Sequence, residues 1–177
     1  MSPEKMIPLM SVKNGAFTGV ASTSALMAWI KLKFIKAPKI KGTVLTAAEL
    51  MHETHATDWE IANLVYLELI SMGYACKMMY LETRWSGVTH TIVLYRDSGN
   101  LWRWVEWRSS IDCGIYGPYP SMTDAVIAVK EAFAAQGAPH KFSGIGEDLI
   151  TPGMTCQSYI DMVKTWKRPP RRRPGKK

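Results

Sequence analysis

Residues 88–107 carry the clearest pattern in the chain, because apolar and polar side chains alternate along two stretches with a period of two. This alternation, together with many β-branched and aromatic residues, predicts two β-strands. The sequence Asp-Ser-Gly-Asn at 97–100 separates the two stretches and is typical of a hairpin turn. We therefore expect an antiparallel hairpin over this segment.

Apolar residues with helical spacing predict several helices on either side of the hairpin. The main helix is expected to begin at Thr57 or Asp58, either of which is a suitable N-cap, and to end near Met72, before Gly73. Other helices are expected at about 22–34, 46–51, 121–136 and 155–166, and a further strand at about 74–82. Glycine, proline and polar residues predict irregular structure over 1–15, 83–87, 109–121 and most of 137–154.

This order of elements predicts an α+β fold in which a small antiparallel sheet packs on a central helix. The 177 residues, 47% of them hydrophobic, are enough for one such domain with terminal extensions. We divide the chain into an N-terminal arm and helix (1–42), a core (43–136), a C-terminal extension with a helix (137–166) and a basic tail (167–177).

The net charge of +7 belongs to the tail. The tail carries seven basic and no acidic residues, and removing them from the 22 Lys and Arg residues leaves 15, which match the 15 Asp and Glu residues. Contact with nucleic acid or an acidic surface is therefore expected of the tail and not of the folded domain. The basic residues of the tail are Lys167, Arg168, Arg171, Arg172, Arg173, Lys176 and Lys177.

The composition argues against several other classes of protein. Cys76, Cys113 and Cys156 are widely spaced and odd in number, so neither a zinc ribbon nor a disulfide framework is indicated. The apolar segment 16–30 is too short and too often interrupted to span a membrane. We expect no metal, no cofactor and no membrane association.

His90 and Glu106 give the hairpin a candidate chemistry. A five-residue connection between the strands, from Arg96 to Asn100, would place the two side chains directly opposite each other on one face. A histidine beside a carboxylate has the character of a base and its orienting acid, the second and third members of a nucleophile triad. The alternative is a polar pair at the edge of an ordinary hairpin.

Several tryptophan residues lie in and around the hairpin, and arginine residues lie among them. These residues are expected either to pack in the core or to form an aromatic anchor surface for a partner protein. The residues that would form this surface are Trp85, Trp102, Trp104, Trp107 and Arg103.

Several motifs, taken together and in order, resemble those of the small transglutaminase-like cysteine-protease domains of phages and mobile elements, which belong to the papain-like group. The resemblance covers roughly half of the chain, and its motifs read ELMHETHATDWEIANL, MGYACKMMYLE, THTIVLYRDSGNLWRWVEW and CGIYGPYPSMTDAV. It implies a papain-like fold in which His90 is the family histidine and Glu106 is the acidic third member.

The nucleophile of that family is missing from this sequence. The resemblance places Asp58 where the family has its catalytic cysteine, and a slip of one residue places Thr57 there. Neither residue supplies the thiolate that the chemistry needs. Cys113 is the one cysteine whose position in the sequence would allow it to approach His90.

We therefore expect a catalytically inactive domain that acts as a structural or interaction protein. The phage distribution of the resembled family implies a virion component (capsid, neck, tail or baseplate), or a protein of the host cytoplasm during assembly. Its expected partners are other structural proteins or further copies of itself. Two alternatives stay open: an active cysteine-type peptidase or acyl transferase with a rearranged site, and a nucleic-acid-binding protein that acts through the basic tail.

Overall fold

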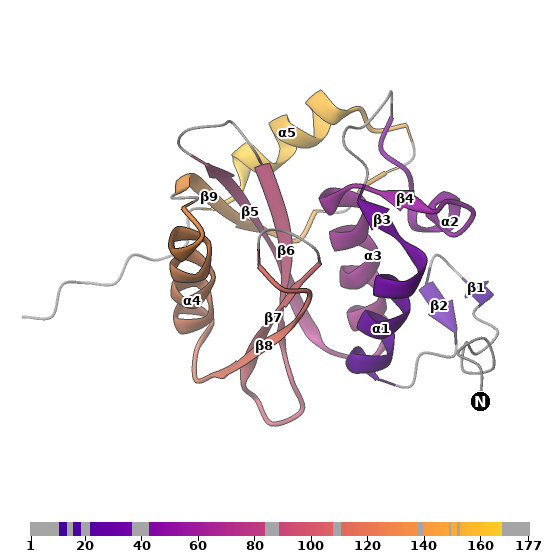
Figure 1. Cartoon of the computed structure of the whole chain (residues 1–177). Coiled ribbons are helices and arrows are strands. Elements are labelled where there is room, and N and C mark those ends of the chain that lie inside the picture. The colour runs from indigo at the N-terminus through magenta and orange to yellow at the C-terminus, as the bar shows by residue number, and fades with distance from the viewer. Residues whose placement is uncertain are drawn as a thin grey trace, which may run out of the picture.

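An antiparallel sheet of five strands, in the order β8-β7-β6-β5-β9, lies at the centre of the structure (Figure 1). The computed structural model describes residues 11–13, 16–18, 22–36, 43–83, 89–107, 111–137, 140–148, 150–151 and 153–167. Its helices are α1 (Thr23–Lys33), α2 (Ala47–Leu50), α3 (Asp58–Ser71), α4 (Met122–Ala135) and α5 (Cys156–Thr165). Over these ranges, no helix is both long enough and apolar enough to cross a membrane.

Two small two-stranded sheets accompany the five central strands. Together with the helices, these antiparallel and short strands confirm the predicted α+β class. The strands of the main sheet are β5 (Ala75–Thr83), β6 (Thr89–Arg96), β7 (Trp102–Glu106), β8 (Gly114–Tyr119) and β9 (His140–Gly146). The small sheets pair β1 (Ser11–Lys13) with β2 (Ala16–Thr18), and β3 (Ile35–Lys36) with β4 (His55–Ala56).

Helices cover both faces of the main sheet and bury a hydrophobic core against each. Met78 and Tyr80 of β5 pack in the larger core with α1, α3 and α5, whereas Met79 and Leu81 of the same strand pack against α4. This division follows from the period of a strand, whose successive side chains point to opposite faces. Figure 1 shows α4 on one side of the sheet and α1 and α3 on the other. The helix that we grouped with the N-terminal arm is thus part of the core.

The central helix α3 is buried on nearly every side, with ten of its 14 residues buried. A helix of this kind belongs to the interior of a domain. Thr57 caps it, because its hydroxyl accepts a hydrogen bond from the amide of Glu60 while the Glu60 carboxylate accepts one from the amide of Thr57. Gly73, with φ of 86°, follows the last turn as predicted.

The hairpin forms, but its pairing differs from the register that we predicted. Arg96 pairs with Trp102, so the five-residue connection runs from 97 to 101 rather than from 96 to 100. Asp97 fixes this connection, because its carboxylate accepts hydrogen bonds from the amides of Gly99 and Leu101, each at 3.0 Å.

The change of register has a limited effect on the two candidate residues. It moves the pairing by an even number of positions, so His90 and Glu106 remain on the same face of the hairpin. They are diagonal neighbours and not the directly opposed pair that we expected.

Three strands occupy segments that we predicted to be irregular. β8 lies within 109–121 and contains two glycines and a proline, which are unfavourable in strands. Tyr116 of β8 stacks on Trp104 of β7 with ring centroids 4.1 Å apart, and this packing outweighs the local composition. β9 lies within 137–154 and is held by its pairing with β5. A third short strand, β1, lies within the segment 1–15 that we also predicted to be irregular.

The C-terminal segment is part of the same fold and not a separate extension. Tyr159 and Val163 of α5 are fully buried in the larger core. Trp166, just after α5, lies on Gly146 of β9, where an added Cβ would collide with the indole ring. The indole Nε1 of Trp166 donates a hydrogen bond of 2.6 Å to Asp148.

Both outer strands of the sheet have an interrupted edge. At β9, the amide of Ile145 donates a hydrogen bond of 2.9 Å to the carbonyl of Lys167, which covers part of that edge. At β8, Gly117 has φ of 119° and is followed by Pro118, which has no amide hydrogen to donate.

Candidate functional site

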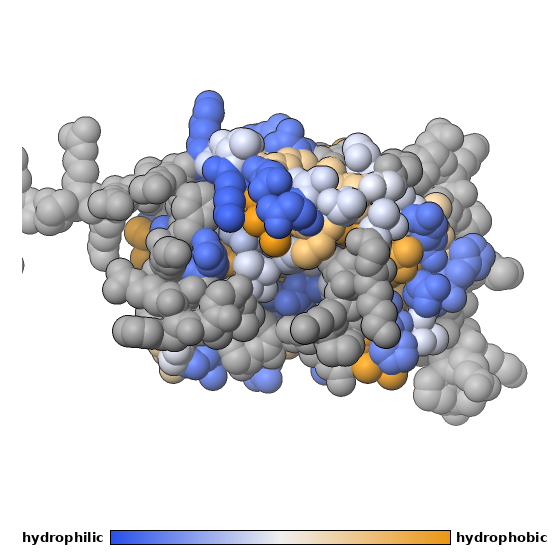
Figure 2. All heavy atoms as spheres, turned by 90° about the horizontal axis from the view of Figure 1, so that it is seen from above, coloured by the Kyte–Doolittle hydropathy of each residue, from blue (hydrophilic) through white to orange (hydrophobic). Residues whose placement is uncertain are grey.

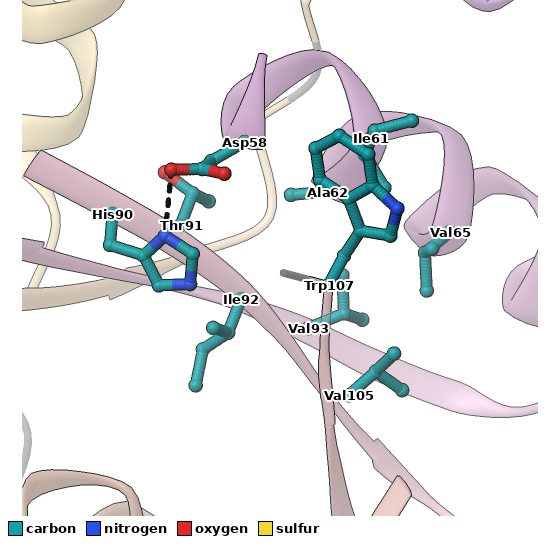
Figure 3. A pocket seen from close by; sticks show the side chains of 10 residues that line it. All are labelled: Asp58, Ile61, Ala62, Val65, His90, Thr91, Ile92, Val93, Val105 and Trp107. Atoms are coloured by element: carbon teal, nitrogen blue, oxygen red, sulfur yellow. Dashed lines mark ion pairs between the residues drawn. The ribbon is translucent and has the colours of Figure 1, made fainter. Parts of the chain in front are cut away.

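Asp58, His90 and Glu106 meet beside the N-terminal end of α3 in a line of two ion pairs. Asp58 Oδ2 lies 3.0 Å from His90 Nδ1, and Glu106 Oε2 lies 2.9 Å from His90 Nε2. The side chains of Asp58, His90 and Glu106 are 9%, 7% and 0% exposed. Figure 3 shows the first of these pairs, with the imidazole of His90 turned toward the carboxylate of Asp58. The structure thus brings together the three residues that the sequence singled out.

Three different elements position these side chains. Asp58 is the first residue of α3, where free amide groups and the helix dipole favour a negative charge. His90 lies on β6 and Glu106 is the last residue of β7, so the hairpin carries the other two members. Phe133 of α4 packs against the imidazole with ring centroids 5.1 Å apart.

The two carboxylates hold the imidazole of His90 in its charged form. Burial by itself lowers the pKa of His90, because a charged ring is poorly solvated inside a protein. The charge of Glu106 and the hydrogen bonds to Asp58 and Glu106 outweigh burial and raise the pKa of His90 to about 9. At neutral pH, His90 is therefore an imidazolium that donates both of its ring protons.

The described groups of this arrangement differ from those of a nucleophile triad. A triad needs a nucleophile whose proton passes to a neutral imidazole. The place beside His90 Nδ1 holds a carboxylate, which has no proton to give, and the Thr57 hydroxyl donates a hydrogen bond of 2.8 Å to Glu60 instead. Because both ring nitrogens of His90 face carboxylates, neither is left to activate the thiol of Cys113.

A small pocket lies between α3 and the hairpin, and the side chains of Asp58, His90 and Trp107 are among those that surround it (Figure 3). Its volume of about 10 Å³ leaves room for roughly one water molecule. Most of its lining is apolar, and a peptide side chain would not fit inside it. The lining residues are Asp58, Ile61, Ala62, Val65, His90, Thr91, Ile92, Val93, Val105 and Trp107.

The tryptophans of the hairpin do not form the shared outer surface that we considered. Trp104 is 1% exposed and Trp107 is 5% exposed, and they belong to different cores. Burial therefore favours, for these two rings, the core-packing alternative over the partner surface. Trp102 is half-buried, Arg103 is paired with Asp97 through a hydrogen bond of 2.7 Å, and Trp85 lies outside the described residues.

The other predicted sites receive little or no structural description. Among the described residues, no cluster of three His, Cys, Asp or Glu side chains is placed to hold a metal ion. Lys167 of the tail is exposed, with its carbonyl bonded to β9. The remaining tail residues, 168–177, lie outside the described part of the chain.

Tyr159 of α5 is a neighbour of this site that the sequence analysis did not single out. Its hydroxyl lies 2.7 Å from Thr91 Oγ1, and its ring stacks on Trp59 with centroids 4.5 Å apart. Trp59 follows Asp58 in the chain, and Thr91 follows His90. The spacing of Tyr159, Val163 and Trp166 indicates the buried face of a helix, but it does not indicate what that face covers.

Neither the family models nor the curated proteins that were searched give a match to this sequence. A function for the chain therefore has to be argued from the geometry of the site and from the motifs.

Proposed function

We propose that the chain is a transglutaminase-like domain whose nucleophile position is occupied by Asp58, and that it serves as a structural or interaction protein. One observation carries this proposal: the buried imidazole of His90 has a carboxylate at each ring nitrogen. The helix terminus, the histidine and the acid stand in the order of a nucleophile triad, without a nucleophile. The site then acts as a brace and not as a catalyst.

The brace has a physical role, because it joins three elements of the fold. One imidazolium links the first turn of α3 to both strands of the hairpin. Breaking a buried ion pair by removing one partner costs about 3–5 kcal/mol, since an uncompensated charge stays in the interior. A protein that depends on this ion-pair network for the stability of its fold, and not for catalysis, would keep the network.

The proposed setting is a phage virion, and it is supported only by the motifs, which resemble those of a family common in phages. The expected partners are other structural proteins or further copies of the chain, in a particle or in the host cytoplasm during assembly. The small pocket beside Asp58 supports a role without substrate, because its volume of about 10 Å³ cannot admit a peptide.

The variant Asp58→Cys tests whether position 58 is the former nucleophile position. A thiol at the start of a helix and beside an imidazole has a lowered pKa. We expect a thiolate near neutral pH, measured by absorbance at 240 nm as a difference from Asp58→Ser. The same substitution combined with His90→Gln is the control and should lose the thiolate. An introduced thiol that ionises at the ordinary pKa of about 8.5 would contradict the proposal.

The structural role is tested by the mass of the purified chain in solution. Light scattering that gives a mass above 19.9 kDa, rising with concentration, would support assembly. A monomer at every concentration, with one native cysteine that reacts much faster than the others, would favour the active-enzyme alternative. Under that alternative, Cys113 is the cysteine expected to react fastest.

A second candidate function is nucleic-acid binding through the tail, favoured by the location of the whole net charge there. Binding of this kind weakens steeply with salt, because it depends on the release of counterions. Deleting residues 168–177 removes six cations and should abolish any salt-sensitive binding of a duplex DNA probe. Binding that persists unchanged after the deletion would exclude this function for the tail.

A further inference from the structure

We propose that α5 is a strap that covers the junction of α3 and β6 beside the Asp58–His90 pair, and that Tyr159 fastens it. This inference rests on the proposed function only for the identity of the site that is closed. It adds a means of control: the site is sealed in the free chain and becomes accessible when α5 lifts.

Tyr159 connects the two elements that carry the ion pair. Its ring stacks on Trp59 of α3 with centroids 4.5 Å apart and an interplanar angle of 25°. Its hydroxyl lies 2.7 Å from the hydroxyl of Thr91 on β6. Since Trp59 and Thr91 directly follow Asp58 and His90 in the chain, one side chain bridges α3 and β6 next to the site. Tyr159 itself has no exposed surface.

The segment that carries α5 is fastened to the fold at both ends. Before the helix, the amide of Val44 donates a hydrogen bond of 2.7 Å to the carbonyl of Met154. After it, Trp166 is bonded to Asp148, and the carbonyl of Lys167 accepts from Ile145. Figure 1 shows α5 lying across the end of the sheet at which β6 begins.

The two faces of α5 suit a helix that packs on the core with one side and meets water with the other. The inner face carries Tyr159 and Val163, both fully buried. The outer face is polar, with Gln157, Asp161 and Lys164 exposed. Figure 2, which views the molecule from the end where α5 lies, shows hydrophilic side chains over much of the described surface.

The strap accounts for the low exposure of Asp58, which is 9% although it begins a helix. The first residue of a helix often lies at the surface, where its free amide groups meet water. Here Tyr159 covers the neighbouring turn, so access to position 58 requires that the contacts of Tyr159 to Trp59 and Thr91 break first. Opening of α5 is a local event of the kind that hydrogen exchange and thiol labelling detect.

Thiol labelling at position 58 tests the strap directly. The full chain with Asp58→Cys is treated with iodoacetamide, and each cysteine peptide is followed by mass spectrometry. We expect slow labelling at position 58 while Tyr159 is present, and labelling at least about tenfold faster when Tyr159→Ala is added. Rapid labelling of Asp58→Cys with Tyr159 intact would overturn the proposal.

Two matched variants and one native cysteine control the experiment. Lys164→Ala alters an exposed residue of the same helix and should leave the rate at position 58 unchanged; equal rates in the Lys164→Ala and Tyr159→Ala backgrounds would overturn the proposal. Cys76 is buried in the core and reports global opening. If Tyr159→Ala raises the labelling rate of Cys76 together with that of position 58, the variant has opened the whole fold. The milder Tyr159→Phe, which removes only the hydroxyl, is then used to test the strap. A selective increase at position 58 supports the strap, and no selective increase overturns it.

The result separates the strap from the proposed function. Thiolate absorbance of Asp58→Cys reports the pairing with His90 and does not depend on access by a reagent. If Tyr159 slows the labelling of position 58 but no thiolate absorbance is found, the strap is supported and the assignment of position 58 as the former nucleophile position is rejected. A thiolate that labels rapidly with Tyr159 in place would do the reverse.

Discussion

His90 donates from both ring nitrogens to buried carboxylates, at 3.0 Å to Asp58 and 2.9 Å to Glu106. The imidazolium offsets the repulsion between two negative groups that would otherwise share the interior. The stability of the hairpin against α3 should therefore depend on the charge of this one ring, and not only on its volume.

Replacing His90 by glutamine should destabilise the fold strongly. Glutamine keeps a polar side chain but removes the cation that lies between Asp58 and Glu106, and the expected loss is about 3–5 kcal/mol in the free energy of unfolding. Urea unfolding at pH 7 measures it. The control is His52→Gln at an exposed position, expected within about 0.5 kcal/mol of wild type. Equal stability of the two variants would show that His90 does not act as a brace.

The brace should weaken as the solution becomes alkaline. The pKa of His90 rises from 6.5 to about 9 on folding, so the folded chain holds this proton more tightly than the unfolded chain. The contribution is complete below pH 6.5 and is lost as the pH rises through 9, on the order of 3 kcal/mol in total. It is measured as the difference in unfolding free energy between wild type and His90→Gln across this range. A difference that stays constant or grows would contradict the ion-pair geometry.

The members of the site differ in how far the sequence reveals them. His90 and Glu106 could be found because alternation along the hairpin put them on one face, and a connection of odd length keeps them there. Asp58 could be found as a helix cap and through the motifs. Tyr159 could not be found, because helical spacing shows that a side chain is buried but not which distant strand it meets.

At the scale of elements, α2 and α3 begin with the same capping box in different surroundings. Glu60 caps α3 through hydrogen bonds of 2.8 Å from the amide and hydroxyl of Thr57, and its second oxygen accepts a bond of 2.9 Å from the amide of Leu45. Glu49 caps α2 through the same two groups of Thr46, at an exposed position. Because the two capping boxes make the same contacts, comparing them shows how burial changes the contribution of a cap to stability.

Glu60→Ala should cost far more stability than Glu49→Ala. Loss of Glu60 leaves the partly buried donors of Thr57 and Leu45 unsatisfied and loosens the turn that holds Asp58, at about 2–3 kcal/mol. The donors at α2 can turn to water, so Glu49→Ala should have a much smaller effect. Urea unfolding of both variants makes the comparison, and equal losses would show that the cap of α3 carries no special weight.

The elements themselves were predictable where their signal is local. The limits of α3 follow from a capping residue and a glycine in the left-handed region, both visible in the sequence. β8 and β9 were missed because glycine and proline argue against strands, while their partners across the sheet, such as Trp104 for Tyr116, decide otherwise. The hairpin register depends on the Asp97 carboxylate, which holds the connection at 97–101.

At the scale of the whole molecule, Gly146 is where the C-terminal segment closes onto the sheet. An added methyl group would collide with the indole of Trp166 and displace it from Asp148. Gly146→Ala should therefore lower the unfolding free energy by about 1–3 kcal/mol and shift tryptophan fluorescence to the red. The control is Gly114→Ala, a strand glycine whose Cβ would make an ordinary contact of 3.8 Å. Similar effects of both variants would contradict this account.

The interrupted edges of the sheet affect how copies of the chain can pack against one another. An open outer strand acts as a template on which fibrils grow. Here Pro118 breaks the hydrogen-bonding pattern of one edge, and the chain's own Lys167 occupies part of the other. These interruptions disfavour the merging of neighbouring copies into one continuous ladder, so dense packing is expected to proceed through side chains and helices while each molecule keeps its own fold.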